Sequence, residues 1–280
     1  MCFVNYNANF LFNRAINVIK VVKNLFRENI KYKKSKKFPT KNNLLFTFCK
    51  LELSYLFNKV GDKDSIFGFD ISFPDRYEFN FVFQEIFVNK DYYVNLDNDF
   101  PTIIDCGCYV GLSILFFKLL YPNSEILGFE AHPKTFQILR NNIEKSKLSN
   151  ITLFNNAVYN SEGTLEFSCV NSGSSKILGK KRESNLRNNV IYVNSILLSD
   201  YINKPVDLLK MDIEGAEVEV IEELAKHNKL RFIKNIVMEF HSLSNAKRLT
   251  KILMTLDKEG FFYRISEACK DVAIIHAYQN

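Results

Sequence analysis

The sequence predicts an α/β fold, with a doubly wound and mostly parallel sheet that carries helices on both faces. Three observations lead to this prediction. From residue 101 onward, short runs rich in β-branched and aromatic residues alternate with helical patterns. The connections between them are short, as in repeated β–α units whose strands lie parallel. Acidic and glycine-containing motifs directly follow the predicted strands, where sheets of this kind bind ligands.

The alternating region supplies strands and helices in a regular order. Strands are expected at residues 102–106, 125–130, 150–158, 206–212 and 233–240, and helices at 112–120, 133–147, 216–226 and 246–258. Between the third and fourth strands, residues 163–170 and 190–198 suggest an inserted hairpin or extended excursion. Residues 261–265 and 271–278 then close the chain as a pair of strands. Residues 101–280 are therefore expected to form one domain.

Two further segments precede this domain. Residues 1–60 are expected to form a basic helical extension, because polar and apolar positions recur with helical spacing over residues 10–31. Residues 61–100 form a preamble packed on the core. It has a strand at 65–73 and a helix at 77–88, in which apolar residues recur at i, i+3, i+4 and i+7.

Charge is unevenly distributed along the chain. The formal net charge is +6, but residues 14–37 hold nine Lys or Arg and one acid, so this segment carries +8 and the rest carries −2. Because the basic character is local, we expect no nucleic-acid partner. The basic helix is expected to dock on the body of the protein, on a partner, or on an anionic membrane surface through residues 10–37.

Composition narrows the class of protein further. Hydrophobic residues make up 47% of the 280 residues, with ten Gly and six Pro, which excludes a wholly disordered or collagen-like chain. The six cysteines are scattered with no signal peptide ahead of them, which favours a reducing compartment. No apolar run reaches the ~18 residues that a membrane-spanning helix needs. We expect a soluble cytoplasmic protein, and leave open an association with the inner membrane surface.

The first motif that carries chemistry, DCGCYVG, runs from Asp105 to Gly111, directly after a predicted strand and at the start of a helix. Gly107 permits a tight turn and a close ligand approach because it has no Cβ. The helix amides that follow suit an anionic group such as a carboxylate, and Asp105 suits a cationic amine. Glu130 closes the second strand, where a carboxylate can accept hydrogen bonds from both ribose hydroxyls. A nucleoside-containing ligand is therefore expected, with an ordinary strand–helix turn as the alternative for the glycine motif alone.

The spacing of this motif distinguishes between nucleoside cofactors. A dinucleotide-binding turn follows the pattern G-x-G-x-x-G, in which the third glycine permits close helix packing. Here the pattern is D-x-G-x-x-x-G, and its acid would repel a pyrophosphate but suits the ammonium of S-adenosylmethionine. We therefore favour S-adenosylmethionine over NAD as the cofactor.

A second motif, KMDIEGAE, closes the fourth strand at residues 210–217. Alternation along a strand places Lys210, Asp212 and, if the strand continues, Glu214 on one side. Capping of the following helix is the alternative role for Glu214 or Glu217.

A third motif, Glu239-Phe240-His241, closes the neighbouring strand. With Asp212, these two polar residues could form an acid–base group or ligate a divalent cation such as magnesium. The catalytic candidates are therefore Asp212, Glu214, Glu239 and His241, and the metal candidates are Asp212, Glu239 and His241. The sequence has no CxxC or HExxH pattern that would indicate a zinc site.

These motifs together resemble the FkbM family of S-adenosylmethionine-dependent methyltransferases. The resemblance rests on PTIIDCGCYVGLS, GFEAHP, LLKMDIEGAE and IVMEFH, with YEFNFVFQEIF and LSDYI, and covers roughly residues 71–280. It implies a seven-stranded, Rossmann-like class I methyltransferase sheet and methyl transfer to a hydroxyl, commonly of a sugar or polyketide.

The resemblance also implies which residues hold the cofactor. Asp105, Gly107 and Gly111 would line the methionine part, Glu130 would hold the ribose, and Asn156 and Ala157 would border the adenine. Tyr109, Ala131 and Asp212 complete the expected cofactor contacts. At Cys108 and Tyr109 the family more often has Ala-Asn, and at Ala131 it frequently has Pro.

An alcohol hydroxyl has a high pKa, so its methylation calls for a base or a metal ion. We expect Asp212 or His241 to take the proton, with Glu214 and Glu239 as orienting or metal-binding groups. The expected acceptor is a small molecule or glycan, and the basic loop 172–189 would favour an anionic one or serve as a lid. Two other functions compete: a catalytically silent methyltransferase-like binding protein, and an NAD-dependent oxidoreductase, against which the missing third glycine counts.

Overall fold

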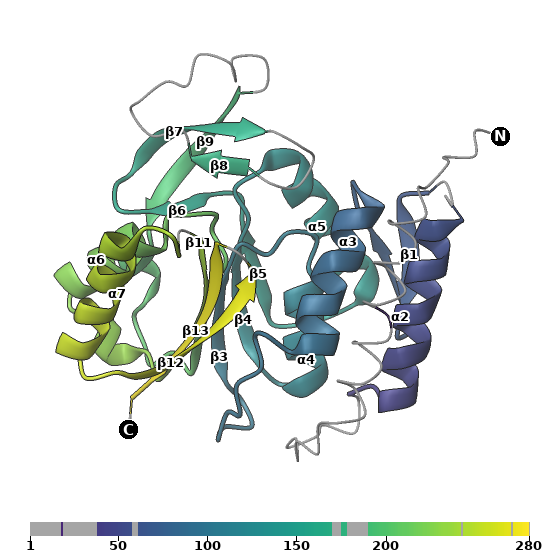
Figure 1. The fold of residues 1–280 in the computed structure, drawn as a ribbon, viewed down its shortest axis with the longest axis horizontal. Helices are drawn as coiled ribbons and strands as arrows, with labels where there is room; N and C mark the ends of the chain where they lie inside the picture. Colours follow the sequence, from purple (N-terminus) through teal and green to yellow (C-terminus); the bar gives the residue numbers. More distant parts are fainter. Residues whose placement is uncertain are drawn as a thin grey trace.

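A computed structural model of the chain describes residues 38–57, 61–169, 175–177, 190–241, 243–269 and 271–279, together with Val18. Its centre is a seven-stranded sheet (Figure 1) with the strand order β12-β13-β11-β10-β3-β4-β5. The strands are β3 (Thr102–Cys106), β4 (Glu125–Phe129), β5 (Ile151–Phe154), β10 (Leu208–Met211), β11 (Asn235–His241), β12 (Phe262–Cys269) and β13 (Val272–Tyr278).

The pairing within this sheet is mostly parallel. The strands from β5 to β11 pair in parallel, and β13 is inserted antiparallel between β11 and β12. The chain leaves β3 for β4 on one side and later returns to β10 on the other, so the strand order reverses between β3 and β10. The prediction of a doubly wound, mostly parallel seven-stranded sheet is confirmed.

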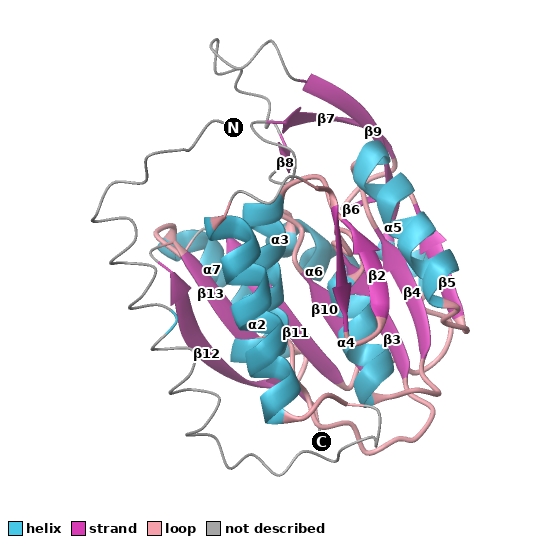
Figure 2. Ribbon diagram, turned by 90° about the vertical axis from the view of Figure 1, so that its right-hand side faces the viewer, coloured by secondary structure: helices cyan, strands magenta, loops and turns pink. Residues whose placement is uncertain are grey.

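Helices cover both faces of the sheet (Figures 1 and 2). On one face lie α4 (Leu112–Leu120) and α5 (Pro133–Ser146), and on the other α6 (Glu217–Lys226) and α7 (Ala246–Lys258), with the 3₁₀ turns η2 (Leu198–Tyr201) and η3 (Leu230–Phe232). Because successive strand residues point to opposite faces, Ile103 packs into the α4 core and Ile104 into the α6–α7 core.

The predicted strand at 65–73 is a hairpin instead, so that prediction was wrong. Its strands are β1 (Lys63–Ile66) and β2 (Phe69–Ser72), which pair antiparallel. The two-residue turn between them has positive φ at Phe67 (52°) and Gly68 (88°), as a tight primed turn requires. A left-handed phenylalanine is uncommon. Here it is offset by ring contacts from Phe67 to Phe83 and Phe87, with centroids 6.1 and 5.3 Å away.

The predicted helix at 77–88 is confirmed, but it changes type half-way. It is α3 (Arg76–Phe83) followed by a π-helical turn, η1 (Gln84–Asn89). Asp75 caps the start by accepting a hydrogen bond from the Glu78 amide at 2.8 Å, and Lys90 ends the turn in a left-handed conformation. Wide π turns often accompany functional sites, and η1 lies beside the pocket described below.

Helix α2 (Lys41–Leu56) precedes the hairpin. It lies within the segment 1–60 that was expected to be a helical extension, although the helical spacing cited for that segment covered only residues 10–31. Thr40 caps α2 by accepting a hydrogen bond from the Asn43 amide at 3.2 Å. Its inner face, with Leu44, Phe48 and Leu51, joins the core that also contains α3 and α4. The predicted helix at 10–31 lies outside the described residues, apart from Val18.

The inserted excursion is a second, four-stranded sheet that lies above the central sheet in Figure 1. Its strands, β6 (Ala157–Tyr159), β7 (Gly163–Cys169), β8 (Ser175–Ile177) and β9 (Val190–Leu197), follow the order β6-β9-β7-β8. The predicted strand at 150–158 is divided between the two sheets. The Asn155 side chain turns the chain there by donating to the carbonyls of Glu130 and Ala131, at 2.8 and 3.1 Å. Most of the loop at 172–189 lies outside the described residues.

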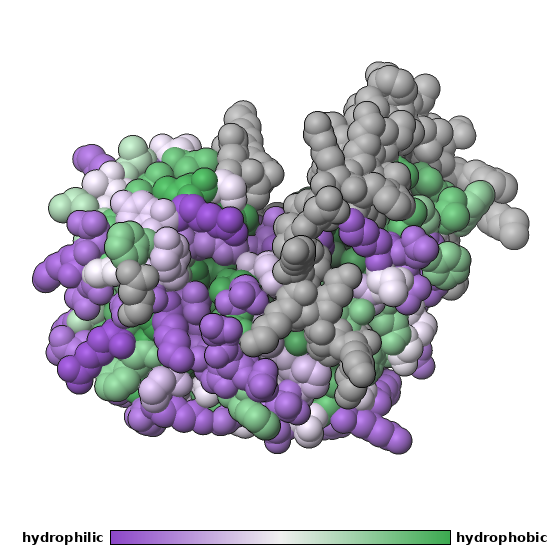
Figure 3. All heavy atoms as spheres, turned by 90° about the horizontal axis from the view of Figure 1, so that it is seen from below, coloured by the Kyte–Doolittle hydropathy of each residue, from purple (hydrophilic) through white to green (hydrophobic). Residues whose placement is uncertain are grey.

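The face of the molecule opposite the small sheet is mostly hydrophilic, with small hydrophobic areas between the polar ones (Figure 3). None of the helices in the described ranges combines the length and the apolarity that crossing a bilayer requires.

The side chain of Asn142 on α5 joins the preamble to the domain. It is fully buried, exchanges two hydrogen bonds with the main chain of Ser72 and donates a third to Val110, all at 2.9 Å. We predict that Asn142→Ala lowers the free energy of unfolding by about 3 kcal/mol, because it leaves buried main-chain groups without partners. Urea denaturation measures this loss. The exposed neighbour Asn141→Ala serves as control, and an equal loss in both variants would contradict the assignment.

Candidate active site

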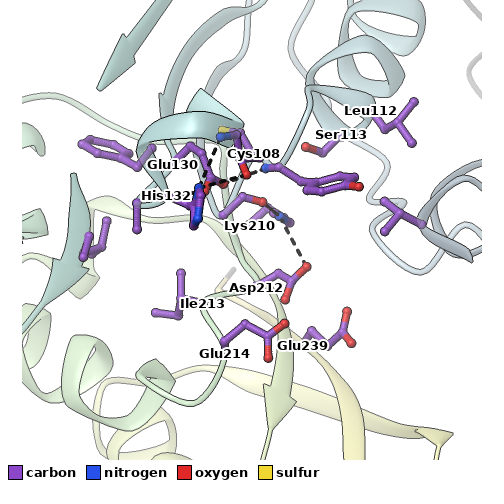
Figure 4. Close-up of a pocket in the computed structure, with 18 of the residues that line it drawn as sticks. Cys108, Leu112, Ser113, Glu130, His132, Lys210, Asp212, Ile213, Glu214 and Glu239 are labelled. Atoms are coloured by element: carbon purple, nitrogen blue, oxygen red, sulfur yellow. Dashed lines mark hydrogen bonds and ion pairs between the residues drawn. The ribbon is translucent and has the colours of Figure 1, made fainter. Parts of the chain in front are cut away.

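A pocket of about 210 Å³ opens where β3, β4, β10 and β11 end, at the reversal of strand order (Figure 4). Three groups of residues line it. The ends of the central strands contribute Gly107, Cys108, Tyr109, Glu130, Ala131, Lys210, Asp212, Glu214, Glu239 and His241; the small sheet and its approach contribute Asn156, Ala157, Val158 and Phe167; α3, η1 and the loop after them contribute Glu78, Phe81, Val82, Glu85, Ile86 and Tyr92.

The turn after β3 packs against the main chain of Asp212, directly after β10, and leaves no space for a ligand at that contact. Gly107 has φ of +84°, and a Cβ there would lie 1.8 Å from the carbonyl oxygen of Asp212, so only glycine fits. The amides of Gly107 and Cys108 both donate to the Phe129 carbonyl, at 2.9 and 3.1 Å. These two amides are therefore not free to bind a ligand. The helix amides that the sequence predicts to bind a carboxylate lie further on, at the start of α4, where Leu112 and Ser113 line the pocket.

Asp105 does hold a cationic amine, but the amine belongs to the protein. Its carboxylate is fully buried, pairs with Lys210 Nζ at 3.1 Å and accepts a hydrogen bond from Ser113 Oγ at 2.5 Å. Asp105 does not line the pocket. Lys210 and Ser113 contact its carboxylate here, and a direct contact of Asp105 with the ligand stays a prediction.

Lys210 links the two strands at the switch point. Its ammonium also donates to the Gly107 carbonyl at 2.6 Å and lies 4.0 Å from Asp212 Oδ2. Burial alone would lower the pKa of Lys210, but the charges of Asp105 and Asp212 raise it, so the lysine stays charged. The ammonium thus fixes both the glycine turn and Asp212.

Glu130 stands at the end of β4 with both oxygens toward the glycine turn and the start of α5 (Figure 4). Oε2 accepts from the Tyr109 amide and Oε1 from the His132 amide, each at 2.9 Å. Each carboxylate oxygen can accept a second hydrogen bond. Burial raises the pKa of Glu130 to about 7, although these two amide donors lower it. The carboxylate is held rigidly at the pocket wall, where the ribose contact was predicted.

One end of the pocket is apolar. Ala131 packs against Ala157 and Phe167, which form a small core with Val193, and Asn156 lines the wall beside them. This end brings together the predicted Ala131, Asn156 and Ala157 and adds Phe167, which the sequence analysis did not single out. The apolar wall suits a flat heterocycle.

The other end of the pocket is acidic and centres on Asp212. Tyr92 Oη lies 3.0 Å from Asp212 Oδ2 and 2.9 Å from Glu239 Oε2. A phenol has one proton and can donate to only one carboxylate at a time. Burial, aided by the charge of Asp212, raises the pKa of Glu239 to about 8, so Glu239 can carry the second proton at neutral pH. The Tyr92 ring also lies 4.9 Å from the Lys210 ammonium, so Tyr92 contacts three of the charged groups.

His241 faces the same acidic end and is oriented from behind. Its Nδ1 lies 3.2 Å from Oε1 of the fully buried Glu217. Its Nε2 lies 3.6 Å from Glu239 Oε1, 3.8 Å from Glu214 Oε2 and 3.9 Å from Asp212 Oδ1. Burial alone would lower the pKa of His241, but the hydrogen bond to Glu217 and the surrounding carboxylates raise it to about 10.

This arrangement gathers the four catalytic candidates. Asp212, Glu214 and His241 each offer a ligand atom, and these atoms all lie within 4.8 Å of one another. Glu239, the third predicted metal ligand beside Asp212 and His241, is adjacent through its Oε1. Glu217 is an orienting group for His241 and also accepts from the Gly215 amide at 3.0 Å.

Gly111, expected in the cofactor site, does not line the pocket. It starts α4 with φ of +99°, and a Cβ there would lie 3.0 Å from Leu139 Cδ1 on α5. Gly111 therefore allows α4 and α5 to pack closely. Tyr109 lines the pocket with φ of +49°, and its hydroxyl is buried.

Sequence reasoning missed most of the wall formed by the preamble. Tyr92, Glu78 and Glu85 all line the pocket. Glu78 and Glu85 lie within the YEFNFVFQEIF segment on which the resemblance partly rests, but the sequence analysis gave them no role, and Tyr92 lies outside every quoted motif. Burial, with the charge of Asp75, raises the pKa of Glu78 to about 7. The available signal was that segment itself, in which Glu78 and Glu85 stand among the apolar positions of the helix predicted at 77–88.

The strand order, the glycine turn at the switch point and the carboxylate at the end of the second strand define a nucleoside-cofactor-binding α/β protein. A family model described as "Methyltransferase FkbM domain" matches residues 105–263, more than half of the 280. The chain belongs to the FkbM methyltransferase family. It is a methyltransferase, and the family implies S-adenosylmethionine as the methyl donor, in place of NAD.

Individual relatives agree with this assignment. "Methyltransferase 1" of Beauveria bassiana (strain ARSEF 2860) is 27% identical over 207 residues, covering 66% of this chain and 82% of that protein. "Methyltransferase sdnD" of Sordaria araneosa is 28% identical over 219 residues, covering 66% and 83%. The crystal structure of methyltransferase FkbM from Methylobacillus flagellatus KT has a TM-score of 0.46 at 13% identity, covering 73% of this chain and 56% of that one; at this score it adds nothing to the assignment.

We predict that Glu130→Gln weakens binding of S-adenosylhomocysteine about 10- to 100-fold, because it removes a charged acceptor worth about 1.5–3 kcal/mol. Isothermal titration calorimetry measures the dissociation constant. Glu144→Gln, on the exposed side of α5, is the matched control.

The same residue gives a pH dependence with a defined sign. Ribose hydroxyls donate to the ionised carboxylate, so binding should tighten as pH rises through about 7 and level off above it. Below that pH the dissociation constant should rise roughly tenfold per unit, because a proton must first leave. A wild-type profile that is flat from acid to neutral pH, or one that Glu130→Gln leaves unchanged, would contradict this role.

Proposed function

We propose that the protein transfers a methyl group from S-adenosylmethionine to a hydroxyl of a small-molecule or glycan acceptor in this pocket. The observation that carries the proposal is the division of one pocket into an apolar end with Glu130 and an acidic end with Asp212. A methyl donor and an acceptor bound at the two ends would meet near the glycine turn.

The residues at the apolar end fit the cofactor. Glu130 would accept hydrogen bonds from the ribose hydroxyls, and Ala131, Ala157 and Phe167 would pack against the adenine. When bound, S-adenosylmethionine supplies a methyl group on a sulfonium whose leaving group is a neutral thioether. The raised pKa values of Glu130 and Glu239 reflect burial and crowded negative charge, which a cationic ligand would relieve.

Asp212 is placed to take the proton of the acceptor hydroxyl. Its main chain touches Gly107, so it is the carboxylate of the acidic end that adjoins the cofactor turn. Tyr92 and Lys210 both engage Oδ2, which leaves Oδ1 directed toward the space shared with His241 and Glu214. A fixed carboxylate of this kind can act as a general base or orient the hydroxyl.

The described lining favours a neutral hydroxylated acceptor over an anionic one. Beyond the cofactor end, the lining includes five acids, Glu78, Glu85, Asp212, Glu214 and Glu239, which outnumber the two cationic side chains, Lys210 and His241, and it also includes the apolar Phe81 and Val82. A phosphate or carboxylate placed there would face like charge. A sugar presents hydroxyls to the acids and apolar ring faces to the aromatic wall, which supports a sugar or glycan as acceptor. The anionic acceptor expected from loop 172–189 rests on residues outside the described part of the chain.

A divalent cation at the acidic end is a second proposed feature, and one specific observation favours it. The atoms that face away from this space already have partners. His241 Nδ1 contacts Glu217, and the Tyr92 hydroxyl contacts both Asp212 Oδ2 and Glu239 Oε2. The inner atoms, His241 Nε2, Asp212 Oδ1 and Glu214 Oε2, converge on one space. A histidine backed by a carboxylate and facing further oxygens is a common metal-site arrangement. A cation there would lower the pKa of an acceptor hydroxyl.

We predict that Asp212→Asn lowers the methyl-transfer rate about 10²- to 10⁴-fold, because it removes the proton acceptor, while S-adenosylhomocysteine still binds. The measurement is transfer of labelled methyl from S-adenosylmethionine to a panel of sugars, sugar nucleotides and glycan fragments. Asp200→Asn, exposed on η2, is the control. Wild-type turnover in Asp212→Asn would remove Asp212 from the mechanism. Cofactor binding without turnover of any hydroxylated acceptor would favour a binding protein.

We predict that Mn²⁺ or Mg²⁺ binds one site per chain in the S-adenosylhomocysteine complex, and that His241→Gln weakens this binding at least tenfold. Calorimetric titration of the metal ion measures both. His227→Gln, at the C-cap of α6, is the matched histidine control. Equal metal binding by wild type and His241→Gln, or none by either, would exclude the cation, and proton uptake would then rest on Asp212 alone.

A further inference from the structure

Helix α2 is apolar on two opposite faces. Leu44, Phe48 and Leu51 are 1–3% exposed and pack into the core. On the outer face, Phe46, Leu53 and Phe57 are 72, 52 and 80% exposed. A helix that is apolar all round is normally covered on every side.

The three outer residues form one continuous stripe. They stand at i, i+7 and i+11, which returns to the same side of an α-helix. Isolated exposed hydrophobic residues are ordinary, but a row over three turns is an interaction surface. Among the described elements, Figures 1 and 2 show α2 as the outermost on its side, with the sheet and the α6–α7 layer behind it.

The charge around this stripe is positive. The only acid within α2 is Glu52, which is buried, whereas Lys41 lies at its start. Lys50, in the middle of the helix, pairs with Asp64 at 2.5 Å. Lys33, Lys34, Lys36 and Lys37 directly precede the helix in sequence. Lys37 is four residues before Lys41, so chain geometry keeps it within about 14 Å of the helix start, whatever path the chain takes.

We propose that the outer face of α2 docks on an anionic lipid surface, with Phe46, Leu53 and Phe57 entering the headgroup boundary and the preceding lysines contacting the headgroups. Two forces hold interfacial helices on such membranes, the burial of apolar side chains and the attraction of basic residues to anionic lipids. The exposed aromatic and aliphatic side chains provide the first and the clustered lysines the second. A second copy of the chain on this face would bring two basic segments together, which like-charge repulsion opposes. This surface is separate from the pocket and independent of the proposed reaction.

The absence of tryptophan allows a direct test on the full chain. Phe57→Trp introduces one indole on the stripe, and Met254→Trp introduces one on α7, where Met254 is 68% exposed on the opposite face of the sheet. With vesicles of phosphatidylcholine and phosphatidylglycerol, the emission of Phe57→Trp should shift to shorter wavelength and that of Met254→Trp should not. Shifts in both, or in neither, would overturn the proposal.

Vesicle sedimentation of the full chain supplies the second measurement. The triple variant Phe46→Ser/Leu53→Ser/Phe57→Ser should reduce the partition coefficient at least tenfold, whereas Tyr192→Ser/Met254→Ser/Phe262→Ser, three exposed residues elsewhere, should not. Wild-type protein should bind neutral phosphatidylcholine vesicles more weakly than anionic ones. Failure of wild type to sediment, or undiminished binding by the stripe variant, would refute the lipid surface. Light scattering that shows a wild-type dimer lost in the stripe variant would assign the face to a second copy.

Discussion

The buried ammonium of Lys210 is the interaction on which the pocket depends. It pairs with Asp105 at the end of β3, contacts the Gly107 carbonyl in the turn, and lies near Asp212 at the end of β10. An ammonium and a carboxylate taken out of water are costly unless both are well paired, and removing one partner of such a pair costs about 3–5 kcal/mol. The cofactor turn and the acidic end are therefore held in register by one charge network beneath the pocket floor.

The residues before the family match, which begins at residue 105, complete the wall of the pocket. Tyr92 places its hydroxyl between Asp212 and Glu239, and α3 with η1 forms the wall opposite the cofactor end. The matched residues 105–263 supply the nucleoside end and the acidic floor. Residues outside the matched region thus line the part of the pocket that we propose for the acceptor.

Much of the fold was predictable because its signals are local. Strand 102–106 and helices 112–120 and 246–258 have the predicted bounds, since each is a strongly patterned run with clear ends. The turn at Phe67 could not be predicted, because the positive φ of this aromatic residue is offset by ring contacts with Phe83 and Phe87, which are distant in sequence. The pairing of Asp105 with Lys210 was not predicted, because strand alternation shows which residues share a side but not which of them pair. Tyr92 could not be found at all, since its role depends on a contact 120 residues away in sequence.

The contact between Gly107 and the Asp212 carbonyl limits how this enzyme can be redesigned. A side chain at 107 would push the β10 end away, so libraries that vary the glycine turn to accept altered methyl donors will also displace the carboxylate that faces the acceptor. Under the proposed function, this backbone contact would couple donor specificity to acceptor reactivity. Alteration of donor preference is better begun at the apolar end, around Phe167 and Ala157, which lie away from that junction.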